Sequence, residues 1–171
     1  HLVLATLHTN DAPGAVARLR DFGCPNFAIN AAVLCVLAQR LVRRVCADCA
    51  QPYEPSSAVL QRLTNDRTGQ FRRGAGCRRC LNSGFRGRVG VYEMFRMSPT
   101  IQLAVERNAS TAVLRQEAIR EGMRAMWQDG VEKARVGLTT VEEVVAVAAA
   151  TLEPDTAHPA GDAIDTMRIS A

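Results

Sequence analysis

The order of hydrophobic and polar positions predicts a strand and then a helix at the start of the chain. Residues 1–7 are apolar almost throughout, which is typical of a buried strand. Asn10 or Asp11 can cap the helix that follows, and Gly23 is placed to end it in the left-handed conformation. The residues expected on its apolar face are Val16, Leu19 and Phe22. Because a domain rarely begins in mid-strand, we expect the chain to be the C-terminal part of a longer protein.

A second helix is expected to begin near Asn26, but the sequence leaves its end open. Apolar residues continue at helical spacing through Val33 and Val36. Residues 39–45 could be the last turns of this helix or a following strand. We favour a strand from about Arg40, because a buried sheet would explain the apolar side chains there.

The middle of the chain, residues 46–92, has little helical periodicity and is rich in Cys, Gly and Arg. We expect a short helix at residues 58–63, an exposed loop at 67–76 and a strand at 88–95. The residues that would share one face of that strand are Val89, Val91 and Glu93.

The last third of the chain has a helical pattern. Ser98, followed by Pro99, can open one helix, and Ser110 or Thr111 can cap the next. The residues expected to face inward from this second helix are Val113, Leu114, Ala118, Ile119 and Met123.

Two further helices are expected before the pattern ends. Residues 127–136 form the first, closed by Gly137. Thr140 and Glu143 have the spacing of a capping box, which opens the second. Residues 153–171 hold two prolines, scattered charges and no periodicity, which predicts a mostly disordered tail.

The strongest chemical signal is a set of four cysteines. Cys46 and Cys49 form one Cys-x-x-Cys pair, and Cys77 and Cys80 form another, with 27 residues between the two pairs. Each pair can fold into a turn that points both sulfurs at one ion. Zinc accepts four thiolates tetrahedrally and needs no open position in a structural role. We therefore predict one structural zinc site with these four ligands.

Disulfides and redox chemistry are the alternatives for these cysteines. Disulfides need an oxidising compartment, which nothing in the sequence indicates, and a redox Cys-x-x-Cys usually occurs once beside a strand. The two remaining cysteines, Cys24 and Cys35, stand at apolar helical positions or at a helix end and are expected to be small core residues.

A second group of polar residues follows the first predicted strand. Thr6, His8, Thr9 and Asn10 would gather at its C-terminal end, the edge where open α/β sheets bind ligands. Alternatively, Thr9 and Asn10 simply cap the next helix and His8 is a surface residue. The pattern by itself does not decide between these two interpretations.

Composition narrows the function classes only slightly. Hydrophobic residues make up 47% of the chain, enough for a packed core, and no apolar run reaches the roughly 18 residues of a membrane span. The net charge is +4, and Lys133 is the only lysine among 21 basic residues. A charge this small and dispersed does not establish a nucleic-acid partner. The arginine excess fits either a compositional bias of the genome or selection for phosphate and carboxylate contacts.

Several motifs, in order along the chain, resemble one family. Residues 1–10 resemble the histidine box of type II secretion and type IV pilus assembly ATPases, the E-type traffic ATPases of the general secretory pathway. The other segments that are similar to signatures of this family are residues 37–44 running into the first cysteine pair, 76–93, 122–126, 128–130 and 137–144. The resemblance covers roughly residues 1–150.

The resemblance implies an α/β fold. It would consist of the C-terminal part of a RecA-like P-loop ATPase core at residues 1–45, a tetracysteine zinc-binding subdomain at 46–92 and a small helical subdomain at 93–152. Residues 153–171 would remain a disordered tail.

The resemblance also implies a function. The whole protein would be a hexameric ATPase on the cytoplasmic face of the bacterial inner membrane, where it drives pseudopilus assembly for type II secretion. Type IV pilus extension is the alternative, whereas retraction motors generally lack the four cysteines. The implied partners are further copies in a homohexamer and the platform proteins of the inner membrane. Thr6, His8 and Thr9 would lie at the nucleotide, with His8 sensing the γ-phosphate.

The departures from the family pattern limit what this chain can do alone. The phosphate loop G-x-x-x-x-G-K-[ST] is absent from it. Without backbone N–H groups and a lysine to bind phosphates, we expect ATP and Mg²⁺ to bind only in the full-length protein. The isolated chain is therefore predicted to be inactive.

A zinc-ribbon module that binds nucleic acid or docks another protein is the alternative of another class. The seven arginines of residues 67–88 favour it. Aromatic residues make up only 5% of the chain, so stacking platforms are few, and we expect no nucleic-acid partner.

Overall fold

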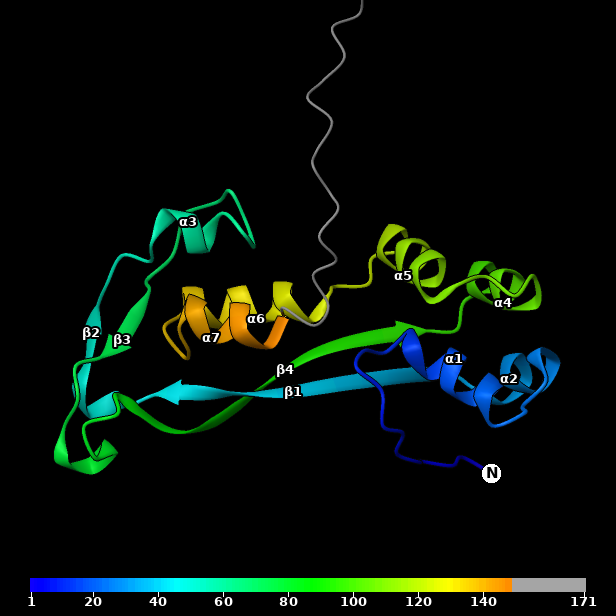
Figure 1. Cartoon of the computed structure of the whole chain (residues 1–171), viewed down its shortest axis with the longest axis horizontal. Helices are drawn as coiled ribbons and strands as arrows, with labels where there is room; N and C mark the ends of the chain where they lie inside the picture. The colour runs from blue at the N-terminus through cyan, green and yellow to red at the C-terminus, as the bar shows by residue number, and fades with distance from the viewer. Residues whose placement is uncertain (149–171) are drawn as a thin grey trace, which may run out of the picture.

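A long two-stranded antiparallel ribbon forms the centre of the molecule (Figure 1). In a computed structural model that describes residues 1–148, strand β1 (Cys35–Val45) pairs with strand β4 (Phe85–Arg96). The start of β1 lies opposite the end of β4, and the register shifts once, just after Arg43. The residues between the two strands therefore leave and re-enter the ribbon at the same end.

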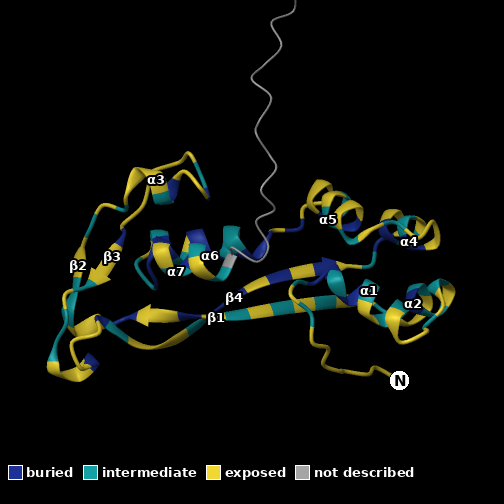
Figure 2. Ribbon diagram, viewed as in Figure 1, coloured by how far each residue is buried: buried dark blue, intermediate teal, exposed yellow. Residues whose placement is uncertain are grey.

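The two faces of the ribbon differ in burial, because side chains alternate across a strand. Val91 and Phe95 of β4 are buried on one face, and Glu93 lies between them. On the opposite face Leu37 and Met94, which stand opposite each other in the register, are more than half exposed (Figure 2).

Two helices cover the buried face at its middle. Helix α6 (Met126–Arg135) packs against β4, and Met126 joins Val91 in one buried cluster. Helix α7 (Val141–Ala148) packs against α6 and reaches β1. Each helix of the described residues is too short or too polar to traverse a lipid bilayer.

Four more helices pack around the end of the ribbon where β1 begins (Figure 1). They are α1 (Gly14–Asp21), α2 (Asn26–Ala32), α4 (Pro99–Glu106) and α5 (Thr111–Arg120). The buried residues that join them to the ribbon include Ala12, Val16, Ile29, Phe95, Ile101, Val105 and Leu114.

The insertion between the strands extends from the other end and folds back onto α6 and α7. Its elements are η1 (Ala47–Cys49), β2 (Ala50–Pro52), α3 (Ser57–Leu60), β3 (Arg72–Gly74) and η2 (Arg78–Cys80). Strands β2 and β3 pair as a short antiparallel sheet. Phe71 and Leu60 of the insertion pack with Val131 of α6 and Val141 of α7. The prediction of an exposed loop at residues 67–76 is therefore wrong in part, because Phe71 is buried and residues 72–74 form β3.

The strand expected at residues 1–7 does not form. Leu2 and Leu4 are 79% and 91% exposed. A strand needs a neighbour for its backbone hydrogen bonds, and none of the other described residues pairs with this segment.

The boundary between the second helix and the first long strand also differs from the expectation. Helix α2 ends at Ala32, and β1 begins at Cys35, about five residues earlier than expected. Cys35 is exposed rather than a core residue, whereas Cys24 is half-buried against the core. Three side chains expected to face inward are instead exposed, by 42% to 59%: Phe22, Val113 and Ile119.

Most expected helix ends are confirmed by their hydrogen bonds. Asp11 Oδ1 accepts from the N–H of Gly14 at 2.7 Å, and Ser98 Oγ accepts from the N–H of Ile101 at 3.2 Å. Gly137 ends α6 with a φ of 75°. The strand with Val89, Val91 and Glu93 on one face is also confirmed. The tail expected at residues 153–171 lies outside the described residues.

Candidate functional site

Two short turns bring the four cysteines together at the far end of the ribbon. Cys46 follows β1 directly and Cys49 closes η1, while Cys77 and Cys80 flank and close η2. Two backbone hydrogen bonds hold the turns to their surroundings: Cys46 N–H donates to the carbonyl of Gly84 at 3.0 Å, and the Ala75 N–H donates to the carbonyl of Cys49 at 2.9 Å.

The second turn depends on glycines. Gly76 and Gly84 have φ values of 98° and 76°, which side chains disfavour. The backbones of Gly74 and Gly84 also approach so closely that a Cβ on Gly74 would collide with the other chain segment. These contacts place Cys77 and Cys80 beside the end of β1.

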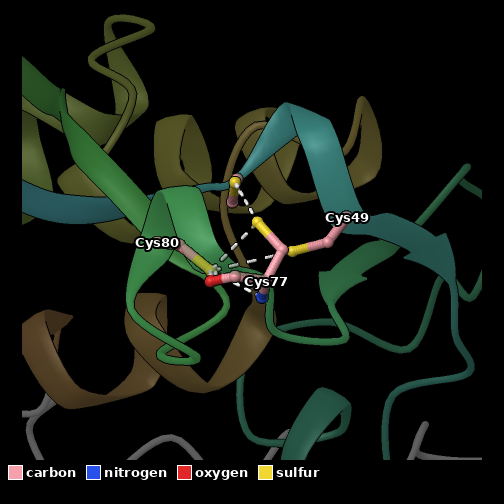
Figure 3. Close-up of side chains that lie close together, drawn as sticks. Cys49, Cys77 and Cys80 are labelled. Atoms are coloured by element: carbon pink, nitrogen blue, oxygen red, sulfur yellow. Dashed lines mark hydrogen bonds between the residues drawn. The ribbon is translucent and has the colours of Figure 1, made fainter.

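The sulfur positions fit a tetrahedral metal ion. Figure 3 shows Cys49, Cys77 and Cys80 with their sulfurs turned toward one another. The Sγ atoms lie 3.9 Å apart for Cys46 and Cys77, 3.9 Å for Cys49 and Cys80, and 3.6 Å for Cys77 and Cys80. Bonds of about 2.3 Å from four thiolates to zinc would separate the sulfurs by about 3.8 Å. A disulfide would need about 2.05 Å, and all four thiols are free.

A bound cation would change the protonation of three of these thiols, those of Cys46, Cys49 and Cys80. Burial raises the pKa of Cys49 to about 12 and raises the pKa of Cys46 as well. Burial acts in the same direction on Cys80, but the backbone N–H groups of Cys77 and Gly84 outweigh it and lower the pKa of Cys80 to about 6. A divalent cation would stabilise the thiolates that burial disfavours, and its binding would release protons. The four cysteines could therefore hold one metal ion.

Charged residues near the turns are partly neutralised by one another. Asp48, between the first two cysteines, pairs with Arg79 at 3.3 Å and with Arg86 at 3.7 Å. Arg43 stacks over the ring of Phe85 at 4.3 Å. These arginines therefore make local contacts among the insertion, β1 and the start of β4.

The histidine turn, residues 6–10, lies before α1 and beside the middle of β1, where Asn10 contacts Arg40. Thr6 and His8 are exposed, and within residues 1–148 neither side chain has a hydrogen-bond partner. Thr9 is half-buried, and its hydroxyl donates to the carbonyl of Asp11 at 2.8 Å. Cys46 comes six residues after Arg40, so this turn lies on the order of 20 Å along the ribbon from the cysteines.

Comparison with known proteins decides the family. A sequence profile described as type II/IV secretion system protein matches residues 1–146. The chain belongs to this family. The match includes the histidine turn, both cysteine pairs and all seven α-helices up to residue 146.

The relatives that the chain resembles include type IV pilus assembly ATPases and type II secretion ATPases. The type IV pilus assembly ATPases PilB of Thermus thermophilus and of Myxococcus xanthus are 41% and 43% identical to it over 150 residues, which is 85% of the chain. The type II secretion system ATPase E of Vibrio cholerae is 39% identical over 149 residues, or 86% of the chain. The aligned region covers only 17%, 26% and 29% of these three relatives, respectively.

One group of buried charges in this secretion-family chain was not expected from the sequence. Glu93 is buried on β4, and Arg115 of α5 lies 3.7 Å from it and also pairs with Asp11. The only local signal is the position of Glu93 between Val91 and Phe95, where an apolar residue is expected. Its partners are distant in sequence, so the spacing of residues could not identify them.

Proposed function

We propose that the chain is the C-terminal portion of a hexameric traffic ATPase that powers type II protein secretion by driving pseudopilus assembly. The observation that carries this proposal is the family match over residues 1–146, which preserves the order of the histidine turn, the cysteine pairs and the C-terminal helices. Type IV pilus extension is the second candidate, and the 41–43% identity to two PilB proteins favours it.

In this proposal residues 1–45 belong to a RecA-like ATPase core. Residues 46–92 are a zinc-binding subdomain, residues 93–152 are a helical subdomain, and the ion is structural Zn²⁺ bound by Cys46, Cys49, Cys77 and Cys80. Three of the six sulfur–sulfur separations support zinc, because they are close to the edge length of a tetrahedron with bonds of zinc–sulfur length, and all four sulfurs lie within 4.8 Å of one another.

The nucleotide would bind at the histidine turn, beside the middle of the ribbon and away from the cysteines. His8 would sense or polarise the γ-phosphate, and Thr6 and Thr9 would contact the phosphates. Two observations support these roles. The turn lies within the family match, and Thr6 and His8 are exposed, which leaves both side chains accessible to a ligand. The phosphate loop and the Mg²⁺ ligands would come from outside this chain.

The whole protein would act as a homohexamer at the cytoplasmic face of the bacterial inner membrane, with the platform proteins of a secretion or pilus machine as partners. No nucleic acid would be involved. Supporting this, the relatives named as ATPases belong to secretion and pilus machines, and Arg79 of the insertion and Arg86 of β4 already pair with Asp48.

A pair of chimeras tests the proposal. This chain would replace the matching segment of the Vibrio cholerae secretion ATPase and, separately, of the Myxococcus xanthus PilB. Restored ATP hydrolysis with restored secretion in the first host, but no pili in the second, would support type II secretion. Pili without secretion would support the second candidate. Two folded chimeras without ATPase activity would overturn both, and His8→Ala in an active chimera should lower kcat.

A further inference from the structure

The buried carboxylate of Glu93 joins parts of the chain that are far apart in sequence. Its side chain is fully buried on the covered face of β4. One oxygen, Oε1, accepts from the N–H of Ala12 at 2.7 Å, just before α1. The other, Oε2, accepts from the N–H of Met126 at 3.2 Å, at the first residue of α6. One side chain therefore holds the beginnings of two helices.

Arg115 connects the same carboxylate to the histidine turn. It extends from α5, is 17% exposed, and places Nη1 3.7 Å from Oε2 of Glu93. Its Nη2 donates to Oδ2 of Asp11, and the other oxygen of Asp11 caps α1 at Gly14. Asp11 and Ala12, which lie three and two residues before the start of α1 at Gly14, are thus both fixed by this charged group.

These contacts, together with the buried side chain of Ala12, tie the histidine turn to the rest of the molecule. Residues 1–8 are exposed, so their own packing does not fix the turn. Asn10 has one further contact, with Arg40 Nη2 at 3.4 Å, which is long for a hydrogen bond. The position of His8 relative to the ribbon therefore depends on Asp11 and Ala12, three and four residues later.

We propose that Glu93 and Arg115 are positioning residues for the His8 turn. Burying a charge is costly, and an apolar residue at position 93 would avoid that cost but would leave the N–H groups of Ala12 and Met126 without partners. Hydrogen bonds to a carboxylate are directional, so the pair fixes the turn more sharply than apolar packing would. The effect of this pair on ATP hydrolysis rests on the function proposed above.

Hydrogen exchange of this chain tests the positioning role without any nucleotide. Arg115→Gln removes the charge that pairs with Asp11 and Glu93, and Arg120→Gln is the matched control, because Arg120 lies on the same helix with a side chain that is 69% exposed. We expect the amide of Ala12 to exchange about tenfold faster in Arg115→Gln, while amides of β1 and β4 keep their rates. Equal protection of Ala12 in the two variants would overturn the proposal.

A second variant separates the pair from a general loss of stability. Asp11→Asn keeps an oxygen for the Gly14 cap but loses the charge that pairs with Arg115. If the two residues act together, the double variant should expose Ala12 no more than either single variant does. Effects that add in full would contradict the proposal.

The third measurement concerns catalysis in an ATPase-active chimera of the kind described above. Arg115→Gln should lower kcat about tenfold or more with little change in KM for ATP, because a displaced turn affects hydrolysis while the phosphate loop still binds the nucleotide. Arg120→Gln should leave both constants unchanged. An active chimera whose kcat is unaffected by Arg115→Gln would overturn this inference but not the proposed function. Chimeras without activity would overturn the function, and the exchange experiment would still decide the positioning role.

Discussion

The carboxylate of Glu143 accepts two hydrogen bonds from Arg43, from its backbone N–H at 3.0 Å and from its guanidinium at 2.6 Å. On the other strand, the carboxylate of Asp129 of α6 accepts a hydrogen bond from the backbone N–H of Tyr92 at 2.9 Å. Helices α6 and α7 thus supply acceptors to backbone groups of β1 and β4 that have no strand neighbour. On each edge of the ribbon one backbone N–H group is thereby occupied and unavailable to another chain.

Replacing Glu143 with Gln should lower the free energy of unfolding by about 1 kcal/mol at pH 7, since the partner arginine is largely solvent-exposed. The hydrogen bond from Arg43 lowers the pKa of Glu143 below its ordinary value. The stabilisation is therefore complete well above the unfolded pKa of about 4.3 and is lost as the pH falls through the lower folded pKa. Urea unfolding at pH 7, 5 and 4 should show wild type and variant converging toward acid. Exposed Glu54, changed to Gln, is the control, and a difference that grows toward acid would be incompatible with this assignment.

Replacing Cys46 or Cys80 with Ser should abolish metal binding. The purified chain is expected to contain about one zinc per molecule under reducing conditions, and either variant should contain nearly none. Cys35→Ser is the control, because Cys35 is exposed and remote from the cluster. The insertion should become more susceptible to protease in the two variants, whereas the amide of Ala12 should keep its protection. Wild-type protein with a zinc content near zero would refute the assignment of the metal.

Replacing Gly130 with Ala should destabilise the contact between α6 and α7. The added Cβ would lie 2.7 Å from Cγ1 of buried Val144, and a valine has little freedom to move away. Alanine would otherwise favour the helix by about 0.5–1 kcal/mol, so we expect a net loss of about 1–2 kcal/mol in the free energy of unfolding. Glu132→Ala on the exposed side of α6 should have little effect by comparison. A stabilised Gly130→Ala protein would show that the two helices separate readily.

The chain should not bind nucleic acid near physiological salt. Arg79, Arg86 and Arg135 are engaged in ion pairs, which leaves the positive charge dispersed. Titration of a labelled DNA or RNA across a salt series measures this directly, with a chain carrying Arg78→Ala and Arg88→Ala as the control for the remaining exposed arginines. Binding at about 150 mM salt that weakens in the control would favour the zinc-ribbon alternative.

Local patterns predicted part of the site well. The cysteine pairs were identifiable because each Cys-x-x-Cys turn is fixed by three or four neighbouring residues, and Gly76 marked the turn beside the second pair. The caps at Ser98 and Ser110 were predictable for the same reason. The nucleotide role of His8, in contrast, came from resemblance alone and stays a prediction.

Features set by distant contacts were not predictable. Val33 and Val36 fit a helix as well as a strand, and only pairing with β4, about 60 residues later, makes β1 begin at Cys35. The role of Glu93 depends on Ala12, which lies 81 residues earlier, and on Arg115, which lies 22 residues later. No spacing along one segment can indicate such a junction.

The insertion connects two strands that pair with each other. A break in the backbone of the insertion would therefore leave the two fragments associated. Residues 65–70 are exposed, so a protease would be expected to cleave there. Each of the two fragments would keep one strand of the ribbon and two of the four cysteines. The fragments would remain joined by the backbone ladder at the ribbon and, with a metal bound, by a cross-link that a chelator opens and a reducing agent does not.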